Sequence, residues 1–286
     1  MKNTAALLLT ASLLSQTALA DNLKFHTYNP QENSIFPVTS VIVEGDSELM
    51  LVDAQFQRND ALKVVSQLQS LNKPLKIIYI SHYDPDFYFG LDVITQAFPK
   101  AKVIATPETA NHIQNSIIGK YNYWSPILKE NAPKALVLPQ PFTGNNLTVG
   151  NSRIAIKGQD IDPAHTYLWD TQSRTLFGGV QLYQGMHLWL ADSQTAEARS
   201  RWQQSLQQMA ELEPKTVIPG HFIGTPSPKV IQENQEYLRH VEKNWHPGET
   251  SKVFIQKIKA EYPNYKGTQD LELSAKVLSG EMKWPQ

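Results

Sequence analysis

Residues 81–90 read Ser-His-Tyr-Asp-Pro-Asp-Phe-Tyr-Phe-Gly and stand between a predicted strand at residues 76–80 and a helical pattern at residues 91–98. His82, Asp84 and Asp86 alternate, so in an extended loop they project to the same side. Imidazole and carboxylate groups at the end of a strand are typical of metal sites. The other interpretation is a solvated acidic turn in which an Asp caps the helix.

The composition limits which chemistry this segment can perform. The 286 residues include 26 Lys and Arg, 27 Asp and Glu, eight His and no Cys. A net charge of −1 lacks the excess of basic residues that a nucleic-acid binder needs. Without Cys there are no disulfides, thiolate nucleophiles or Cys-based metal sites. Any metal must therefore be held by His, Asp and Glu.

The first twenty residues read as an export signal. Met1-Lys2-Asn3 is a short positive start, and residues 5–14 form an apolar run too short to span a bilayer. Ala18-Leu19-Ala20 has the small-x-small pattern read by signal peptidase, so we expect cleavage after Ala20 and a periplasmic or secreted protein. A buried N-terminal helix is the alternative. Residues 21–286 then form a single domain with a helical C-terminal tail, and no later stretch is apolar enough to span a membrane.

Strand and helix patterns alternate in both halves of the chain. Residues 34–43 and 48–53 predict a hairpin, residues 59–71 predict the first helix, and residues 119–133 predict a loop or a helical excursion. The remaining predicted strands lie at 102–105, 135–138, 146–149, 153–156, 174–177 and 216–219, with helices from 107, over 195–212 and after 228. This order fits an α/β fold of two packed sheets covered by helices, an αββα sandwich. The pattern alone does not separate it from a doubly wound sheet.

Two more His-bearing turns decide between these folds. Pro163-Ala164-His165-Thr166 falls in a loop between strands, and Pro219-Gly220-His221 directly follows a strand. With residues 81–90, these segments resemble the metallo-β-lactamase superfamily. That family has a Ser/Thr-His-x-His-x-Asp-His loop, a Gly/Pro-x-His-Ser/Thr loop, Phe-Gly-Gly before an Asp, and Pro-Gly-His. The resemblance extends over about residues 33–224 and implies the four-layer αββα sandwich of that superfamily.

The chain departs from the family pattern at three positions. Asp84 stands in place of the second motif His, and Phe87 in place of the His that follows the motif Asp. Val180 replaces the Asp that bridges two metals after Phe-Gly-Gly. By the resemblance, the first metal position keeps its ligands with one substitution, Asp84 for His. The second metal position loses two ligands, at Phe87 and Val180. The resemblance therefore implies one zinc ion rather than two.

The resemblance implies a zinc site of His82, Asp84 and His165, with Asp86 and His221 nearby. An alternative set is His82, Asp86 and His221. Two imidazoles, one carboxylate and a water are a known ligand set for a catalytic zinc. Both sets remain open on the sequence.

The implied function is an exported metal-dependent hydrolase. Zinc lowers the pKa of its bound water to about 7, and the resulting hydroxide would attack a small ester, lactone, amide or phosphoester. Asp86, when it is not a ligand, would orient that water or carry its proton. The competing hypothesis is a metal-poor member of the family that binds a small ligand and has lost catalysis.

Aromatic residues near the motif have two interpretations. Residues 87–89 and residues 121–124 could form the wall of a substrate pocket or belong to the core. His187 could lie near the site or pack against a neighbouring element, and Asp192 or Ser193 is expected to cap the helix that follows. No Gly-x-Ser-x-Gly elbow is present, which argues against an α/β-hydrolase.

Overall fold

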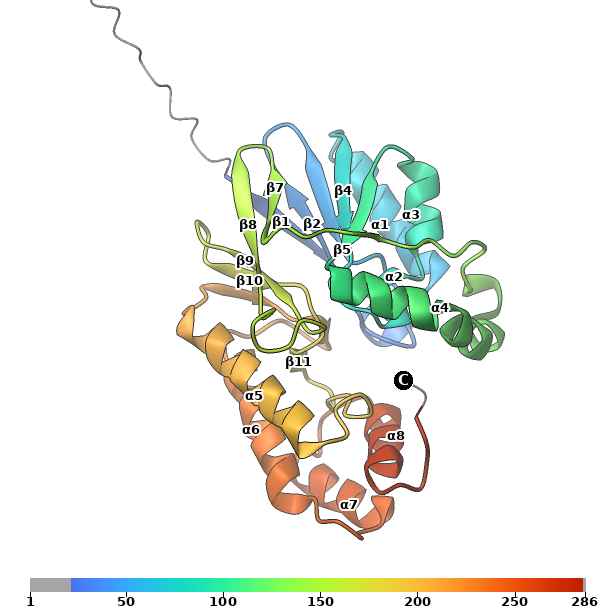
Figure 1. Ribbon diagram of the computed structural model, residues 1–286, viewed down its shortest axis with the longest axis vertical. Helices are drawn as coiled ribbons and strands as arrows, with labels where there is room; N and C mark the ends of the chain where they lie inside the picture. Colours follow the sequence, from blue (N-terminus) through green and yellow to red (C-terminus); the bar gives the residue numbers. More distant parts are fainter. Residues whose placement is uncertain (1–21, 285–286) are drawn as a thin grey trace, which may run out of the picture.

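The computed structural model describes residues 22–284, with two large β-sheets at its centre (Figure 1). The first sheet has six strands that neighbour one another in chain order. Its first three strands are antiparallel and the rest are parallel. The strands are β1 (Lys24–Tyr28), β2 (Ser40–Glu44), β3 (Leu49–Val52), β4 (Leu75–Tyr79), β5 (Lys102–Ala105) and β6 (Gln140–Pro141).

The second sheet has five strands in the order β12-β10-β9-β8-β7. Two short strands form a separate parallel pair: β11, which follows β10 in the chain, and β13, which follows β12 and begins with His221. The strands are β7 (Asn146–Val149), β8 (Ser152–Lys157), β9 (Tyr167–Asp170), β10 (Thr175–Phe177), β11 (Tyr183–Gln184), β12 (Thr216–Ile218) and β13 (His221–Phe222).

Alternation along β2 and β3 explains why the sheets pack face to face. Val41, Val43 and Val52 belong to the core between the sheets, where they meet Leu168 and Phe177 of the second sheet. Ile42 and Leu51, which alternate with these valines along the strands, face the other way, into the larger core under the helices. Successive side chains of a strand point to opposite faces, so a strand buried on both faces reads as a continuous apolar run.

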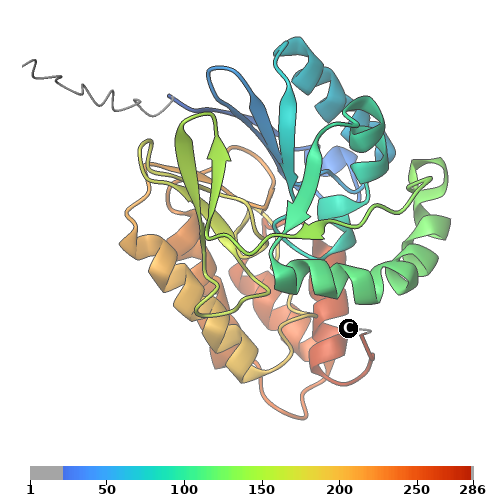
Figure 2. The ribbon, with the colours of Figure 1, turned by 45° about the horizontal axis from the view of Figure 1, so that its top comes forward.

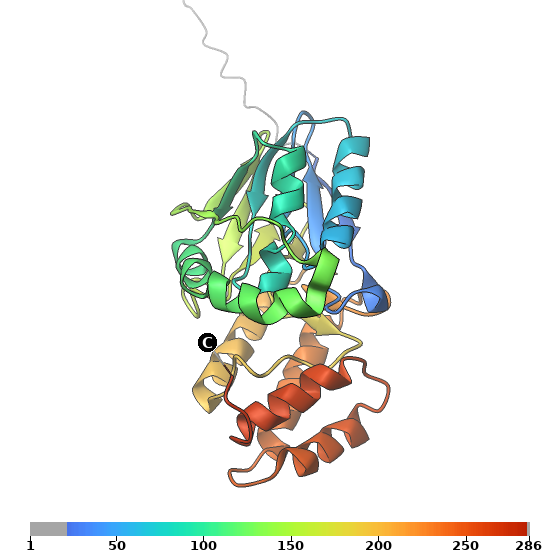
Figure 3. The ribbon, with the colours of Figure 1, turned by 90° about the vertical axis from the view of Figure 1, so that its right-hand side faces the viewer.

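Helices cover the outer faces of both sheets (Figures 2 and 3). Those of the first sheet are α1 (Arg58–Ser70), α3 (Leu91–Ala97) and, beside β5 and β6, α4 (Pro107–Leu128). The short α2 (Pro85–Tyr88) follows β4. Those beside the second sheet are α5 (Ala196–Glu211) and α6 (Val230–Asn244), followed by α7 (Ser251–Glu261) and α8 (Thr268–Leu278). The predicted αββα arrangement is confirmed.

Two local predictions were wrong, and one open alternative is decided. Residues 135–138 form no strand, because Pro133 and Pro139 flank them and the chain reaches the sheet only at the edge strand β6. The hairpin strand begins at Ser40 rather than at residue 34. For residues 119–133 the sequence allowed a loop or a helical excursion. The chain is helical up to Leu128, and Pro126 lies in the last turn of α4.

Two sequence predictions concern export and membrane spans. The predicted export signal lies outside the described residues. Within residues 22–284, none of the helices is both long and apolar enough to cross a bilayer.

A buried hydrogen-bond relay ties the two sheets together beside the motif. Asp53 follows β3, and it accepts hydrogen bonds from the Ser81 amide (2.8 Å) and the Ser81 hydroxyl (2.6 Å). The Gly179 amide, after β10, donates to Ser81 Oγ (2.8 Å). The three strand ends therefore meet at the residue that precedes His82. Burial raises the pKa of Asp53 to about 8, so this carboxyl is largely protonated at neutral pH.

This raised pKa predicts a pH dependence of stability. The folded chain holds the Asp53 proton up to about pH 8, whereas the unfolded chain releases it near 3.8. The folded state thus binds more protons between these values, and its stability falls as pH rises through this window. We expect Asp53→Asn to remove a slope of up to about 1.4 kcal/mol per pH unit. Urea unfolding from pH 5 to 8 measures it, with Asp160→Asn as control. Equal slopes in wild type and Asp53→Asn would contradict the assignment.

Candidate functional site

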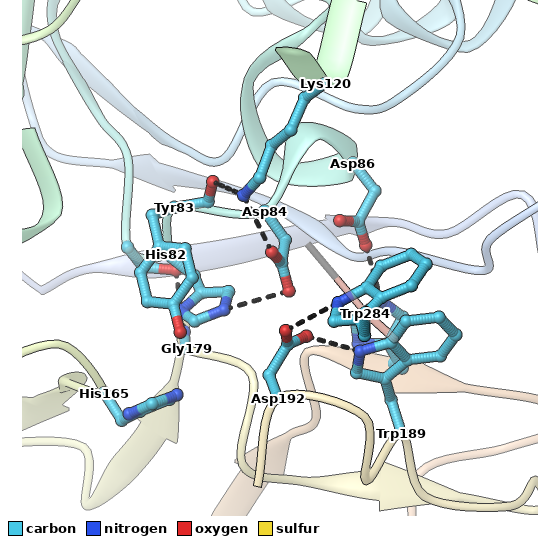
Figure 4. Close-up of polar contacts among 12 residues, drawn as sticks. His82, Tyr83, Asp84, Asp86, Lys120, His165, Gly179, Trp189, Asp192 and Trp284 are labelled. Atoms are coloured by element: carbon cyan, nitrogen blue, oxygen red, sulfur yellow. Dashed lines mark hydrogen bonds and ion pairs between the residues drawn. The ribbon is translucent and has the colours of Figure 1, made fainter. Parts of the chain in front are cut away.

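The motif side chains come from loops at the ends of strands of both sheets. His82, Asp84 and Asp86 follow β4, His165 precedes β9, and His221 begins β13. Asp84 is the residue before α2, and Pro85 opens that helix, where a missing amide proton costs nothing. The turn therefore fixes the backbone of Asp84 and presents its carboxylate toward the loops of the second sheet (Figure 4).

Asp84 lies between an imidazole and an ammonium group. His82 Nε2 is 3.2 Å from Asp84 Oδ2. Lys120, from α4, donates to Asp84 Oδ1 (3.1 Å) and to the Tyr83 carbonyl (2.8 Å), as Figure 4 shows. Burial alone would raise the pKa of Asp84, but Lys120 and His82 hold it well below its usual range. Burial lowers the pKa of His82, so this imidazole is neutral at neutral pH. Lys120 thus compensates the charge of Asp84.

His165 stands beside this group, next to a second carboxylate. Its ring centroid is 5.1 Å from that of His82. Its Nδ1 lies 3.0 Å from Asp162 Oδ2, an ion-pair distance, although the ring is turned so that the N–H does not point straight at the oxygen. Burial would raise the pKa of Asp162, but His165, the Ala164 amide and Arg201 lower it to about 2. Asp162 therefore faces His165 as an anion.

Asp86 and His221 form a separate pair. His221 Nε2 is 2.7 Å from Asp86 Oδ2, and the His221 and Asp86 side chains are only 5% and 8% exposed. Tyr183 stacks on the His221 ring, with centroids 4.8 Å apart and planes 4° from parallel. The buried Phe87 ring contacts both His82 and His221, at 5.3 and 5.4 Å between centroids. An apolar ring thus stands against both pairs at the position where the family pattern has a ligand.

These donors do not form a metal site as they lie. Among residues 22–284, no three His, Asp or Glu side chains come close enough together to hold an ion. His82 Nδ1 and His221 Nδ1 are buried without a hydrogen-bond partner in the part of the chain described. A metal-bound His normally donates this second N–H to a carboxylate or carbonyl. The structure therefore brings the predicted ligands together as two pairs plus His165, and the ligand assignment itself stays a prediction.

A cavity of about 480 Å³ opens over these groups. Tyr123 and Trp124 line it, as the pocket interpretation predicted, whereas Phe87, Tyr88 and Phe89 are at most 2% exposed and belong to the core. His187 does not line the cavity, because it is buried against the Tyr237 hydroxyl, 2.9 Å from its Nδ1. The charged and imidazole groups of the site line this cavity together with further aromatic side chains: Asp84, Asp86, Lys120, Asp162, His165, Asp192, Arg201, His221 and Asp270, with Phe36, Tyr83, Tyr183, Trp189 and Trp284.

Neither Asp192 nor Ser193 caps α5, contrary to expectation. The side chain of Thr195 accepts from the Ala198 amide and caps that helix instead. Asp192 accepts the indole N–H groups of Trp189 and Trp284, the latter at 2.9 Å (Figure 4). Trp284 lies 92 residues along the chain, so no local pattern could have predicted this contact. Lys120 was missed for the same reason, since it lies 36 residues from Asp84. Asp162 lies only three residues before His165, so its contact is local and the sequence offered that spacing.

Comparison with known proteins agrees with this architecture. The model of the metallo-beta-lactamase superfamily matches residues 34–221. The chain belongs to the metallo-β-lactamase superfamily. It is 26% identical over 215 residues to the uncharacterized protein YobT of Bacillus subtilis (strain 168), covering 71% of this chain and 91% of YobT. Members of this superfamily generally bind metal ions, typically zinc, and membership suggests a metallo-hydrolase.

Solved structures of the superfamily share the fold. A metallo-beta-lactamase family protein from Thermus thermophilus superposes with a TM-score of 0.58 at 14% identity, covering 90% of this chain and 91% of that one. The DIM-1 metallo-beta-lactamase gives 0.54 at 19% identity, covering 77% and 94%. A metallo-beta-lactamase from Pontibacter korlensis gives 0.51 at 16% identity, covering 78% and 97%. At these identities the likeness establishes the fold alone.

The contact between Lys120 and Asp84 predicts an effect on metal affinity. In Lys120→Met, Asp84 and His82 keep their positions while the competing cation is gone, so we expect zinc affinity to rise by about tenfold or more. Competition with a zinc-sensitive dye measures it. Lys120→Arg keeps the charge and should leave the affinity low, and Lys63→Met is the matched surface control. Equal zinc affinity in wild type and Lys120→Met would contradict this reading of the site.

Proposed function

We propose that this chain hydrolyses a small molecule bound in the 480 Å³ pocket, with His165 as the base that activates water. The observation that carries the proposal is the contact between His165 Nδ1 and Asp162 at the wall of this pocket. An imidazole whose Nδ1 lies at ion-pair distance from a carboxylate favours the tautomer in which Nδ1 carries the proton and Nε2 is free to accept one. The anionic Asp162 also stabilises the imidazolium that forms when His165 takes a proton from water.

The pocket brings two acid–base groups to one bound substrate. His165 lies beside His82, and the Asp86–His221 pair contacts the same Phe87 ring that His82 contacts. Asp86 is the second acid–base group, since its carboxylate is hydrogen-bonded to His221 and lines the same cavity. General acid–base catalysis of this kind contributes typically about 10²- to 10⁴-fold. A small ester, lactone, amide or phosphoester is the proposed substrate.

The second candidate is a hydrolase that depends on one zinc ion. Its support is the spacing of His82 Nε2 and Asp84 Oδ2, 3.2 Å, because neighbouring ligands of a tetrahedral zinc stand roughly 3.3 Å apart. The generally metal-dependent superfamily supports it as well. Such a site requires Lys120 to release Asp84, and His165 to turn toward the same point.

A screen with and without chelator tests both candidates. Small esters, lactones, amides and phosphoesters are offered to protein purified without chelator, then with EDTA, then with added zinc. We expect turnover to survive EDTA and to fall about 10²- to 10³-fold in His165→Gln, because the base is lost. Asp162→Asn should lower turnover as well, and His240→Gln, outside the pocket, should not.

Each other outcome has a separate meaning. Turnover that EDTA abolishes and zinc restores favours the zinc-dependent hydrolase. Binding of substrates without turnover under any of these conditions contradicts both candidates and favours a ligand-binding protein that has lost catalysis.

We also propose that the chain is exported. The support is the sequence of residues 1–20, with its positive start, apolar run and Ala18-Leu19-Ala20 site. We expect the mature protein, expressed with its own first residues in a bacterial host, to begin at Asp21 and to appear in the periplasm or medium. Mass spectrometry of the intact protein measures this. A full-length cytoplasmic product would contradict it.

A further inference from the structure

Five aromatic side chains form a closed circuit of contacts along the wall of the pocket. Phe36 contacts Trp124 (5.3 Å between ring centroids) and Trp189 (6.4 Å), and Trp189 contacts Trp284 (5.2 Å). Tyr123 contacts Trp284 (6.2 Å) and Trp124 (4.9 Å), which closes the circuit. All five pairs meet edge to face, with planes at 73° to 85°, and all five side chains line the 480 Å³ cavity. We call this set the aromatic wall.

The aromatic wall is not part of the hydrophobic core. Its rings come from four separate segments of the chain: the loop before β2, α4, the loop between β11 and α5, and the segment after α8. Four of the rings are half-buried, and Tyr123 is 47% exposed. Single exposed aromatic residues are common, but several that contact one another inside one cavity mark a ligand site. The aromatic wall therefore offers an apolar surface to whatever the pocket binds.

Trp284 reaches this wall on a short strap, residues 279–284, that follows α8. Gly280 has a φ of +74°, a left-handed conformation that reverses the chain just past the end of the helix. Glu281 then accepts hydrogen bonds from the Ser251 amide (2.8 Å) and hydroxyl (2.7 Å), which fixes the strap to the start of α7. The strap thus runs from α8 back toward α4 (Figure 1).

Asp192 holds the end of the strap against the pocket. Its Oδ1 accepts the Trp284 indole N–H (2.9 Å) and its Oδ2 accepts that of Trp189, so one carboxylate positions both rings (Figure 4). On its other side Trp284 contacts Tyr123 of α4. Trp284 therefore joins the α4 side of the wall to the Trp189 side, and its removal would open the circuit.

We propose that the substrate carries an uncharged aryl group, and that Trp284 is the specificity-determining residue that holds this group in the pocket. An aryl group against this wall meets both edges and faces of rings, and such pairs contribute more than buried apolar area alone. The bond to be hydrolysed would then lie beside His165, which lines the same cavity. This inference rests on the proposed function, because it takes the same pocket as the substrate site.

Binding of compounds with no bond to hydrolyse tests the inference on the wild-type protein. The first pair of probes is 2-phenylethanol and its aliphatic counterpart 2-cyclohexylethanol, measured by calorimetry and by tryptophan fluorescence. We expect the aryl alcohol to bind about threefold or more tighter, the size of an aromatic pair. The second pair, 3,3-dimethylbutan-1-ol and choline, has one shape with and without a positive charge. We expect choline to bind no tighter than the neutral alcohol.

This binding assay and the activity screen fail independently. An aryl preference without turnover in the screen contradicts the hydrolase proposal and leaves this inference standing. Turnover without an aryl preference contradicts this inference alone. Tighter binding of choline overturns it as well, because aromatic side chains that enclose a quaternary ammonium group recognise a cation instead.

Variants locate the preference at the strap. Trp284→Leu keeps an apolar side chain, so it should weaken 2-phenylethanol binding about threefold to tenfold and change 2-cyclohexylethanol binding little. Trp284→Phe keeps a ring without the indole N–H and should retain most of the aryl preference. Lys283→Ala, an exposed neighbour outside the pocket, is the matched control and should bind like wild type. An unchanged aryl preference in Trp284→Leu would overturn the role of Trp284.

Discussion

The ion pair of Lys120 with Asp84 is the constraint on which the site depends. Asp84 stands in the turn between β4 and α2, and Lys120 crosses from α4 to reach it and the Tyr83 carbonyl. A buried carboxylate needs a positive partner, because desolvating an unpaired charge costs several kcal/mol. In this superfamily a metal ion generally fills such a role. Here an ammonium group on the chain itself already does so.

This arrangement changes what the remaining motif residues can do. His82 is neutral beside Asp84, while Asp86 is bonded to His221, and Phe87 contacts both imidazoles. His165 lies beside a third carboxylate, the anionic Asp162. The relay from Asp53 through Ser81 to Gly179 holds the loops of both sheets in register around it. The fold of a metallo-hydrolase is thus kept while the charges at its centre are rearranged.

The sequence predicted the fold well because the motifs that carry it sit at strand ends in a fixed order. Most strands followed from apolar periodicity, whereas the αββα layers followed from the family resemblance that the motifs carry. Residues 135–138 form no strand, because the prolines on both sides outweighed their apolar composition. Ligand candidates could be found from spacing, yet their pairing could not. Lys120 and Trp284 contact the site through folding, and nothing in their local sequence distinguishes them from surface residues. Asp162 is different, because it lies three residues before His165 in the same loop. Charge balance in a pocket is a property of the tertiary structure.

A double-mutant cycle on Lys120 and Asp84 tests the central claim most directly. Unfolding free energies are measured in chelator for wild type, Lys120→Met, Asp84→Asn and the double variant. The account predicts a coupling energy of about 1 kcal/mol or more in favour of the pair, since both groups are largely shielded from water. A coupling near zero, with wild-type protein stabilised instead by stoichiometric zinc, would contradict it.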